Sequence, residues 1–140
     1  MEEIVAIMMS WAVTLSGYPA PAAMPTVQMV PHSFLVEHAC RGMECHVQGW
    51  FAGGQTIYLD QSLDPVQGLY DSSVMLHEFV HYLQQESNVS GIHTTCVANV
   101  AAEREAYGAQ REYLVRYGVY RPVGSSMHNV GCEVAVRQPQ

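Results

Sequence analysis

Residues 77–81 read His-Glu-Phe-Val-His, and this motif constrains the fold more than any other part of the chain. Side chains four residues apart lie on one face of a helix, so the imidazoles of His77 and His81 can reach a single ion. Glu78 is rotated by about 100° from His77, which suits a base better than a ligand. A zinc ion held by two His and one carboxylate keeps a position for water and lowers the pKa of that water to about 7. The motif therefore predicts a zinc site with Glu78 as the base that takes the water's proton.

The motif lies in a segment with the periodicity of an amphipathic helix. Apolar residues recur at helical spacing from Val74 to Leu83, after Asp71-Ser72-Ser73, which offers capping side chains, and before Gly91. We therefore expect a helix over residues 71–87, with its histidine face at the boundary between the core and a cleft. The competing interpretation is an ordinary amphipathic helix that carries two histidines by chance.

A third ligand must come from another part of the chain. The metzincin pattern would place Gly at 84 and His at 87, and it is excluded because this chain has Gln84 and Ser87. A second helical segment, residues 94–117, carries two candidate carboxylates, Glu103 and Glu105. Packing favours Glu105, because it lies on a stripe of small residues that would let another helix approach closely: Ala98, Ala101, Ala102 and Ala109.

In this second segment the chain resembles the gluzincins. Residues 103–107, Glu-Arg-Glu-Ala-Tyr, match the gluzincin element E-x-x-A-[DN] in the Glu and the Ala, with Tyr107 in place of the acidic or amide residue. The resemblance implies that Glu103 is the third zinc ligand, and we favour it over Glu105.

The resemblance covers roughly residues 4–118. It rests on the two motifs and on four supporting parts of the sequence: Trp11, residues 17–19, residues 49–51 and residues 57–59. Together they look like a family of small bacterial gluzincin-like proteins of undetermined function. The resemblance implies an α+β minimal gluzincin fold, in which a short sheet with an edge strand lies beside the HExxH helix and the Glu-bearing helix. It also implies peptidase chemistry on a peptide or protein substrate.

Length and composition are those of one domain. A chain of 140 residues that is 49% hydrophobic can bury about two-thirds of its unfolded surface, enough for one core. We therefore expect a single domain over residues 1–140, with a core of about 4–118 and a C-terminal tail at 119–140. Thirteen acidic residues against six basic ones give a net charge of −7 without any basic cluster, which argues against a nucleic acid partner. No apolar run is long enough to predict a membrane span.

The remaining elements follow from periodicity and from the positions of proline and glycine. We expect a helix with Trp11 in the core, a strand, a short helix and a β-hairpin, over residues 3–16, 26–30, 32–40 and 46–60 respectively. Residues 57–60 would be the outer strand of the sheet. Such an edge strand either pairs with an extended substrate along the cleft or only completes the core. After Gly118 we expect a loop with one short strand.

Four cysteines allow three disulfide pairings. Their spacing does not fit a structural zinc site. We favour Cys40–Cys45 and Cys96–Cys132, since the second pair would tie the tail to the start of the Glu-bearing helix. Disulfides favour an exported or periplasmic protein, and free thiols a cytoplasmic one. The N-terminus leaves the compartment open, because Glu2-Glu3 has the wrong charge for a signal peptide.

Other histidines and tyrosines carry weaker signals. Four histidines have no partner at ligand spacing and are expected to be ordinary surface or boundary residues: His32, His38, His46 and His128. His93 lies between the two metal-bearing helices and could serve as a transition-state donor or a substitute ligand. Tyr82, Tyr107 and Tyr113 are candidates for an oxyanion donor, and the sequence does not discriminate among them.

We therefore predict a zinc metallopeptidase with one catalytic Zn²⁺, with His77, His81 and Glu103 as ligands and Glu78 as base. One alternative is a non-catalytic zinc-binding structural or interaction module whose metal only clamps two helices together. Another is an interaction domain in which the motif is vestigial. Glu78 favours the catalytic interpretation, because a structural site fills its fourth position with a protein ligand and needs no carboxylate beside it.

Overall fold

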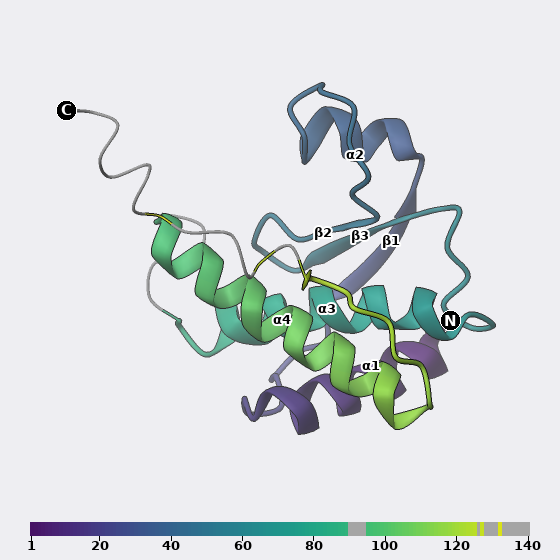
Figure 1. Cartoon of the computed structure of the whole chain (residues 1–140), viewed down its shortest axis with the longest axis vertical. Helices are drawn as coiled ribbons and strands as arrows, with labels where there is room; N and C mark the ends of the chain where they lie inside the picture. The colour runs from purple at the N-terminus through teal and green to yellow at the C-terminus, as the bar shows by residue number, and fades with distance from the viewer. Residues whose placement is uncertain (90–94, 126, 128–131, 133–140) are drawn as a thin grey trace.

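Four helices and a three-stranded sheet make up the computed structural model, which describes residues 1–89, 95–125, 127 and 132. The expected α+β class is confirmed. Along the chain the elements are α1 (Glu2–Ser16), β1 (Thr26–Val30), α2 (His32–His38), β2 (Gly49–Trp50), β3 (Thr56–Asp60), α3 (Leu69–Glu86) and α4 (Cys96–Arg116). Figure 1 shows the three long helices α1, α3 and α4 gathered on one side of the small sheet, with α2 on the other side.

The sheet has the strand order β1-β3-β2, so the prediction that residues 57–60 form an outer strand is wrong. Strand β3 is central because β1 pairs with it in parallel on one side and β2 pairs with it antiparallel on the other. Ile57 and Leu59, which alternate along β3, are both fully buried, as a central strand requires. The two edge strands are β1 and β2, and β2 contacts α3.

Helix α3 is buried on all sides. Every residue from Ser72 to Gln84 is buried, because α3 contacts α1, α4, β2 and β3. The helix begins at Leu69, two residues before the predicted start, and no side chain caps it. The predicted capping role of Asp71-Ser72-Ser73 is therefore wrong. These residues lie inside the first turns, where the Asp71 carboxylate accepts a hydrogen bond from the Asp64 amide and the two serine hydroxyls donate to helix carbonyls.

Helix α4 packs along α3 through a stripe that differs from the predicted one. Its buried residues are Ala102, Ala106, Ala109, Gln110, Tyr113 and Leu114, whereas Ala101 and Glu105 are exposed. The Thr95 side chain caps the helix by accepting a hydrogen bond from the Ala98 amide. Trp11 of α1 packs edge-on against Tyr113, with 5.6 Å between the ring centroids, in agreement with its predicted place in the core.

Both predicted disulfides, Cys40–Cys45 and Cys96–Cys132, are present. Such bonds are typical of proteins that fold in an oxidising compartment. Within the described residues, no helix has the length and apolar character that crossing a membrane requires. His93 and His128 lie outside the described residues, so their predicted roles stay predictions.

Candidate metal centre

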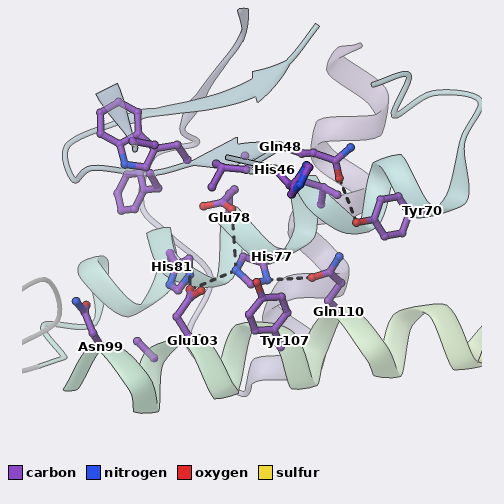
Figure 2. Close-up of a pocket in the computed structure, with 17 residues that line it drawn as sticks. His46, Gln48, Tyr70, His77, Glu78, His81, Asn99, Glu103, Tyr107 and Gln110 are labelled. Carbon is purple, nitrogen blue, oxygen red and sulfur yellow. Dashed lines mark hydrogen bonds and ion pairs between the residues drawn. The ribbon is translucent and has the colours of Figure 1, made fainter. Parts of the chain in front are cut away.

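The three predicted ligands lie together between α3 and α4 (Figure 2). His77 Nε2 is 3.3 Å from Glu103 Oε1, and His81 Nε2 pairs with the same oxygen. One ligand atom from each residue lies within 4.8 Å of the other two. In the part of the chain that the structure describes, no other group of His, Cys, Asp and Glu meets this geometry. Helical spacing places the two imidazoles on one face of α3, and the packing of α4 brings Glu103 opposite them.

Two glutamines orient the imidazoles. His77 Nδ1 is 3.0 Å from Gln110 Oε1, and His81 Nδ1 is 2.8 Å from Gln84 Oε1. Because an amide oxygen only accepts hydrogen bonds, each Nδ1 carries a proton, and Nε2 is the nitrogen that a neutral ring offers to a metal. The amide nitrogens fix the glutamines in turn: Gln110 Nε2 donates to Ser73 Oγ, and Gln84 Nε2 donates to the Ala102 carbonyl.

Glu105 is engaged elsewhere. Its Oε1 accepts hydrogen bonds from the Tyr18 hydroxyl at 2.6 Å and from Gln84 Nε2 at 2.9 Å. Burial and the hydrogen bond to Glu105 raise the pKa of Tyr18 to about 12. Glu105 thus links α4 to α3 and to the turn that follows α1, and of the two candidate carboxylates only Glu103 reaches the histidines.

Glu78 lies beside the three ligands but outside their group. Its Oε2 is 4.0 Å from His77 Nε2, and Figure 2 shows the carboxylate directed from α3 towards the edge of the sheet, away from Glu103. The absence of a side chain at Gly49 leaves room for this approach, because a Cβ there would lie only 3.0 Å from both Cγ and Oε2 of Glu78. Only 7% of Glu78 is exposed, and this burial raises the pKa of its carboxyl group.

His77, Glu78 and His81 of α3 line one wall of a pocket of about 710 Å³. Helix α4 lines a second wall, and residues 46–51, which include β2, line the wall opposite the ligands. Glu78 and Glu103 are the only acidic residues among the described lining, and it contains no Lys or Arg.

Groups of opposite charge lie together at these residues. Burial alone would lower the pKa of His81, but the hydrogen bond to Glu103 and the charges of Glu78 and Glu103 outweigh it and raise that pKa to about 9. Burial would likewise raise the pKa of Glu103, and the hydrogen bonds from His77 and His81 instead hold it well below its usual range. A metal that binds these residues therefore displaces a proton from His81.

Residues 1–131 match a family model described as Domain of unknown function (DUF6647). The chain belongs to the DUF6647 family. No curated protein and no solved structure matches it. All three candidate ligands, Glu78 and both orienting glutamines lie within the DUF6647 match.

Only one of the three candidate tyrosines faces the pocket of this DUF6647 chain. The Tyr82 hydroxyl donates to the Ala23 carbonyl, and the hydroxyls of Tyr113 and Ser72 hydrogen-bond each other. Tyr107 lines the pocket, with its ring centroid 4.4 Å from that of His77. Burial and the charges of Glu103 and Glu78 raise the pKa of Tyr107, so its hydroxyl keeps its proton.

The sequence did not predict that two further residues, His46 and Gln48, line the pocket. His46, expected to be an ordinary surface histidine, lies on the wall of the pocket opposite the ligands (Figure 2). Gln48 accepts a hydrogen bond from the Tyr70 hydroxyl at 3.1 Å, which joins that wall to the start of α3. The sequence carries no signal for either residue, because their place depends on how the loop before β2 folds over α3.

Proposed function

We propose that this DUF6647 protein is a zinc metallopeptidase of the gluzincin type. His77, His81 and Glu103 would hold one Zn²⁺, and Glu78 would act as the general base. Bound zinc would supply a water molecule of lowered pKa and polarise the scissile carbonyl. The observation that carries the proposal is the position of Glu78, a buried carboxylate that lines the pocket beside the ligands without joining them.

The donor set fits zinc. Two imidazole nitrogens and one carboxylate are the ligands of catalytic zinc sites that keep a fourth position open. Each imidazole donates the outer hydrogen bond that metal-bound histidines need, His77 to Gln110 and His81 to Gln84. A structural zinc site would need a fourth protein ligand, and no other His, Cys, Asp or Glu of the described residues joins the group.

The protein's own residues account for the proton transfers. Glu78 would take a proton from the attacking water and pass it to the departing amine, which its raised pKa favours. The Tyr107 hydroxyl would donate a hydrogen bond to the carbonyl oxygen as negative charge develops there.

The edge strand β2 supports an extended peptide as substrate, because a peptide backbone can pair with that strand along the pocket. The two disulfides support an exported location.

Zinc content and peptide cleavage test the proposal together. The purified protein should hold one zinc ion, and His77→Ala and His81→Ala should each abolish stoichiometric binding. Glu78→Gln keeps the shape of the side chain and removes the base. We expect this variant to keep its zinc and its Tm while cleavage falls by about 10²-fold, measured by mass spectrometry of a peptide library.

The outcomes separate the proposal from its alternatives. A protein that binds zinc and cleaves nothing is a structural or interaction module. A protein that binds no zinc has lost the function of the motif. Cleavage by Glu78→Gln at the wild-type rate would rule out water activation by this residue.

A further inference from the structure

A segment beyond α4 packs against the back of the pocket. Residues 119–125, which we call the strap, run back along α4 after Gly118 (Figure 1). Arg111 Nη1 donates to the Val123 carbonyl at 2.9 Å, and Arg104 Nη2 donates to the Met127 carbonyl at 3.2 Å. The Cys96–Cys132 disulfide ties the chain further on to the first residue of α4. The chain is therefore fastened to α4 both before and after Gly124.

The strap touches Tyr107 at Gly124. The backbone there has φ +72°, and a Cβ at this position would overlap the Cβ, Cγ and Cδ1 atoms of Tyr107. The same tyrosine ring packs edge-on against the imidazole of His77. Tyr107 thus contacts a candidate metal ligand and the strap at once.

A second pocket tyrosine also meets the strap. The Arg121 guanidinium lies 3.9 Å from the ring centroid of Tyr70, whose hydroxyl donates to Gln48 across the pocket. The strap therefore contacts two of the tyrosines that line the pocket, although no strap residue is itself part of the lining.

We propose that the strap is a positioning element of the pocket and that Gly124 is its positioning residue, holding Tyr107 against His77. The absence of a side chain at Gly124 lets the backbone lie directly on the ring. Fastening by Arg111 and by the disulfide keeps the strap from lifting away. The consequence for zinc chemistry rests on the proposed function, whereas the contact between Gly124 and Tyr107 does not.

Gly118 provides a matched control. It has a similar backbone conformation, φ +81°, but a Cβ there would meet no atom within 4 Å. Gly118→Ala and Gly124→Ala therefore impose the same kind of backbone strain, and only the second displaces Tyr107. We expect Gly124→Ala to weaken zinc binding about tenfold, the lower end of the effect of outer-shell changes, and to alter the visible spectrum of the cobalt-substituted protein. Gly118→Ala should match the wild type in both measurements.

A double-mutant cycle isolates the contact. In a Tyr107→Ala background the strap no longer meets the ring, so Gly124→Ala should cause no further change in zinc affinity or cobalt spectrum. The proposal is overturned if Gly124→Ala behaves like Gly118→Ala, or if its effect persists without the Tyr107 ring.

The role of Gly124 can still be tested if the protein does not bind zinc or if Gly124→Ala does not fold. If the wild type binds neither metal, the proposed function is wrong, and the same cycle on the free energy of unfolding still measures the coupling of Gly124 to Tyr107. Additive effects would then overturn the strap proposal. If Gly124→Ala does not fold, Arg111→Met replaces it, because this change removes the hydrogen bond to Val123 without adding a Cβ to the strap. Unchanged zinc affinity and cobalt spectrum in Arg111→Met would count against the proposal.

Discussion

At the residue scale, two carboxylates two positions apart on α4 have separate tasks. Glu103 faces the imidazoles of His77 and His81, whereas Glu105 accepts hydrogen bonds from Tyr18 and Gln84. Two residues correspond to about 200° around a helix, so the two side chains cannot serve the same site. Glu103 is a candidate metal ligand, and Glu105 joins α4 to α3 and to the turn after α1.

Substitution should separate these tasks. Glu103→Gln removes the charge that a zinc ion needs, so we expect it to weaken zinc binding far more than Glu105→Gln, as measured by competition with a chelating dye. Glu105→Ala removes two hydrogen bonds and should lower the free energy of unfolding by about 1 kcal/mol while leaving zinc affinity near that of the wild type. Stronger loss of zinc from the position-105 variants would reverse the ligand assignment.

Sequence reasoning succeeded at the residue scale wherever one helix sets the geometry. The spacing of His77 and His81 is a property of α3 alone, and it places both rings on one face. The hydrogen bond from His77 to Gln110 and the one from Tyr18 to Glu105 depend on how distant parts of the chain pack together, which periodicity does not describe. The contact between His81 and Gln84 could have been predicted, because Gln84 lies three residues after His81 on the same helix and therefore near the same face.

At the element scale, the loop between α2 and β2 contributes to the wall opposite the candidate metal site, and several contacts hold it in place. The Cys40–Cys45 disulfide closes it, and Tyr70 binds Gln48 at its end. His32 Nδ1 donates to Asp60, and its Nε2 donates to the Cys45 carbonyl. Since both partners accept, both ring nitrogens carry protons and the charged imidazole is favoured.

This histidine makes the loop sensitive to pH. The hydrogen bonds to Asp60 and to the Cys45 carbonyl raise the pKa of His32, and Glu44 lies nearby at 3.4 Å. Burial would raise the pKa of Asp60, but hydrogen bonds from Ser62 and His32 outweigh it and lower that pKa. His32 therefore stabilises the fold fully below its unfolded pKa of about 6.5, and this contribution is lost as pH rises through the folded value. The contribution of Asp60 is present above about pH 4 and is lost as pH falls.

We expect His32→Gln to lower the free energy of unfolding most near pH 5–6 and progressively less towards pH 9. Urea titrations of wild type and variant across this range measure the difference. His46→Gln, an exposed position in the same loop, is the control and should lack this trend. A His32→Gln effect that is constant with pH would show that the imidazole acts by shape alone.

Strand β2 meets Glu78 through Gly49, and this contact supplies a second prediction at the element scale. Gly49→Ala would place a methyl group 3.0 Å from the Glu78 carboxylate and 3.1 Å from Val74, so the carboxylate has to move. We expect any peptidase activity to fall by about tenfold or more with zinc stoichiometry unchanged, because a small misplacement of a catalytic group is costly. Gly108→Ala, where a Cβ meets nothing within 4 Å, should leave activity unchanged.

The sequence predicts which segments are helices and strands better than it predicts which of these elements lie side by side. The predicted helices and strands before Gly118 are present, because apolar periodicity follows local geometry, although the first strand of the hairpin is shortened to residues 49–50. The short strand predicted after Gly118 is absent from the residues that the structure describes there. The central place of β3 was missed, because its pairing with β1 joins residues 30 positions apart through a parallel register that leaves no local pattern. The early start of α3 at Leu69 was missed because Asp71 and the two serines form hydrogen bonds other than caps.

For the whole molecule, the two disulfides constrain loops of different size. Cys40 and Cys45 are separated by 5 positions, whereas Cys96 and Cys132 are separated by 36. Loop-closure entropy predicts losses of about 2 and about 4 kcal/mol when the short and the long disulfide are removed. We therefore expect the double variant Cys96→Ser/Cys132→Ser to have a clearly lower Tm than Cys40→Ser/Cys45→Ser in calorimetry. The reverse order would show that the short loop contributes more through the His32 contacts than through chain entropy.

The two sides of the pocket come from different parts of the fold. Every candidate ligand and both glutamines that orient them belong to α3 and α4, while the facing wall is built by Ala39 and residues 46–51. A family built in this way can exchange the amino acids of that loop, and so the molecules it admits, without disturbing the helices that would carry the reaction. Divergence within DUF6647 would then accumulate on one wall of the pocket, and members with different preferences would share an unchanged opposite wall.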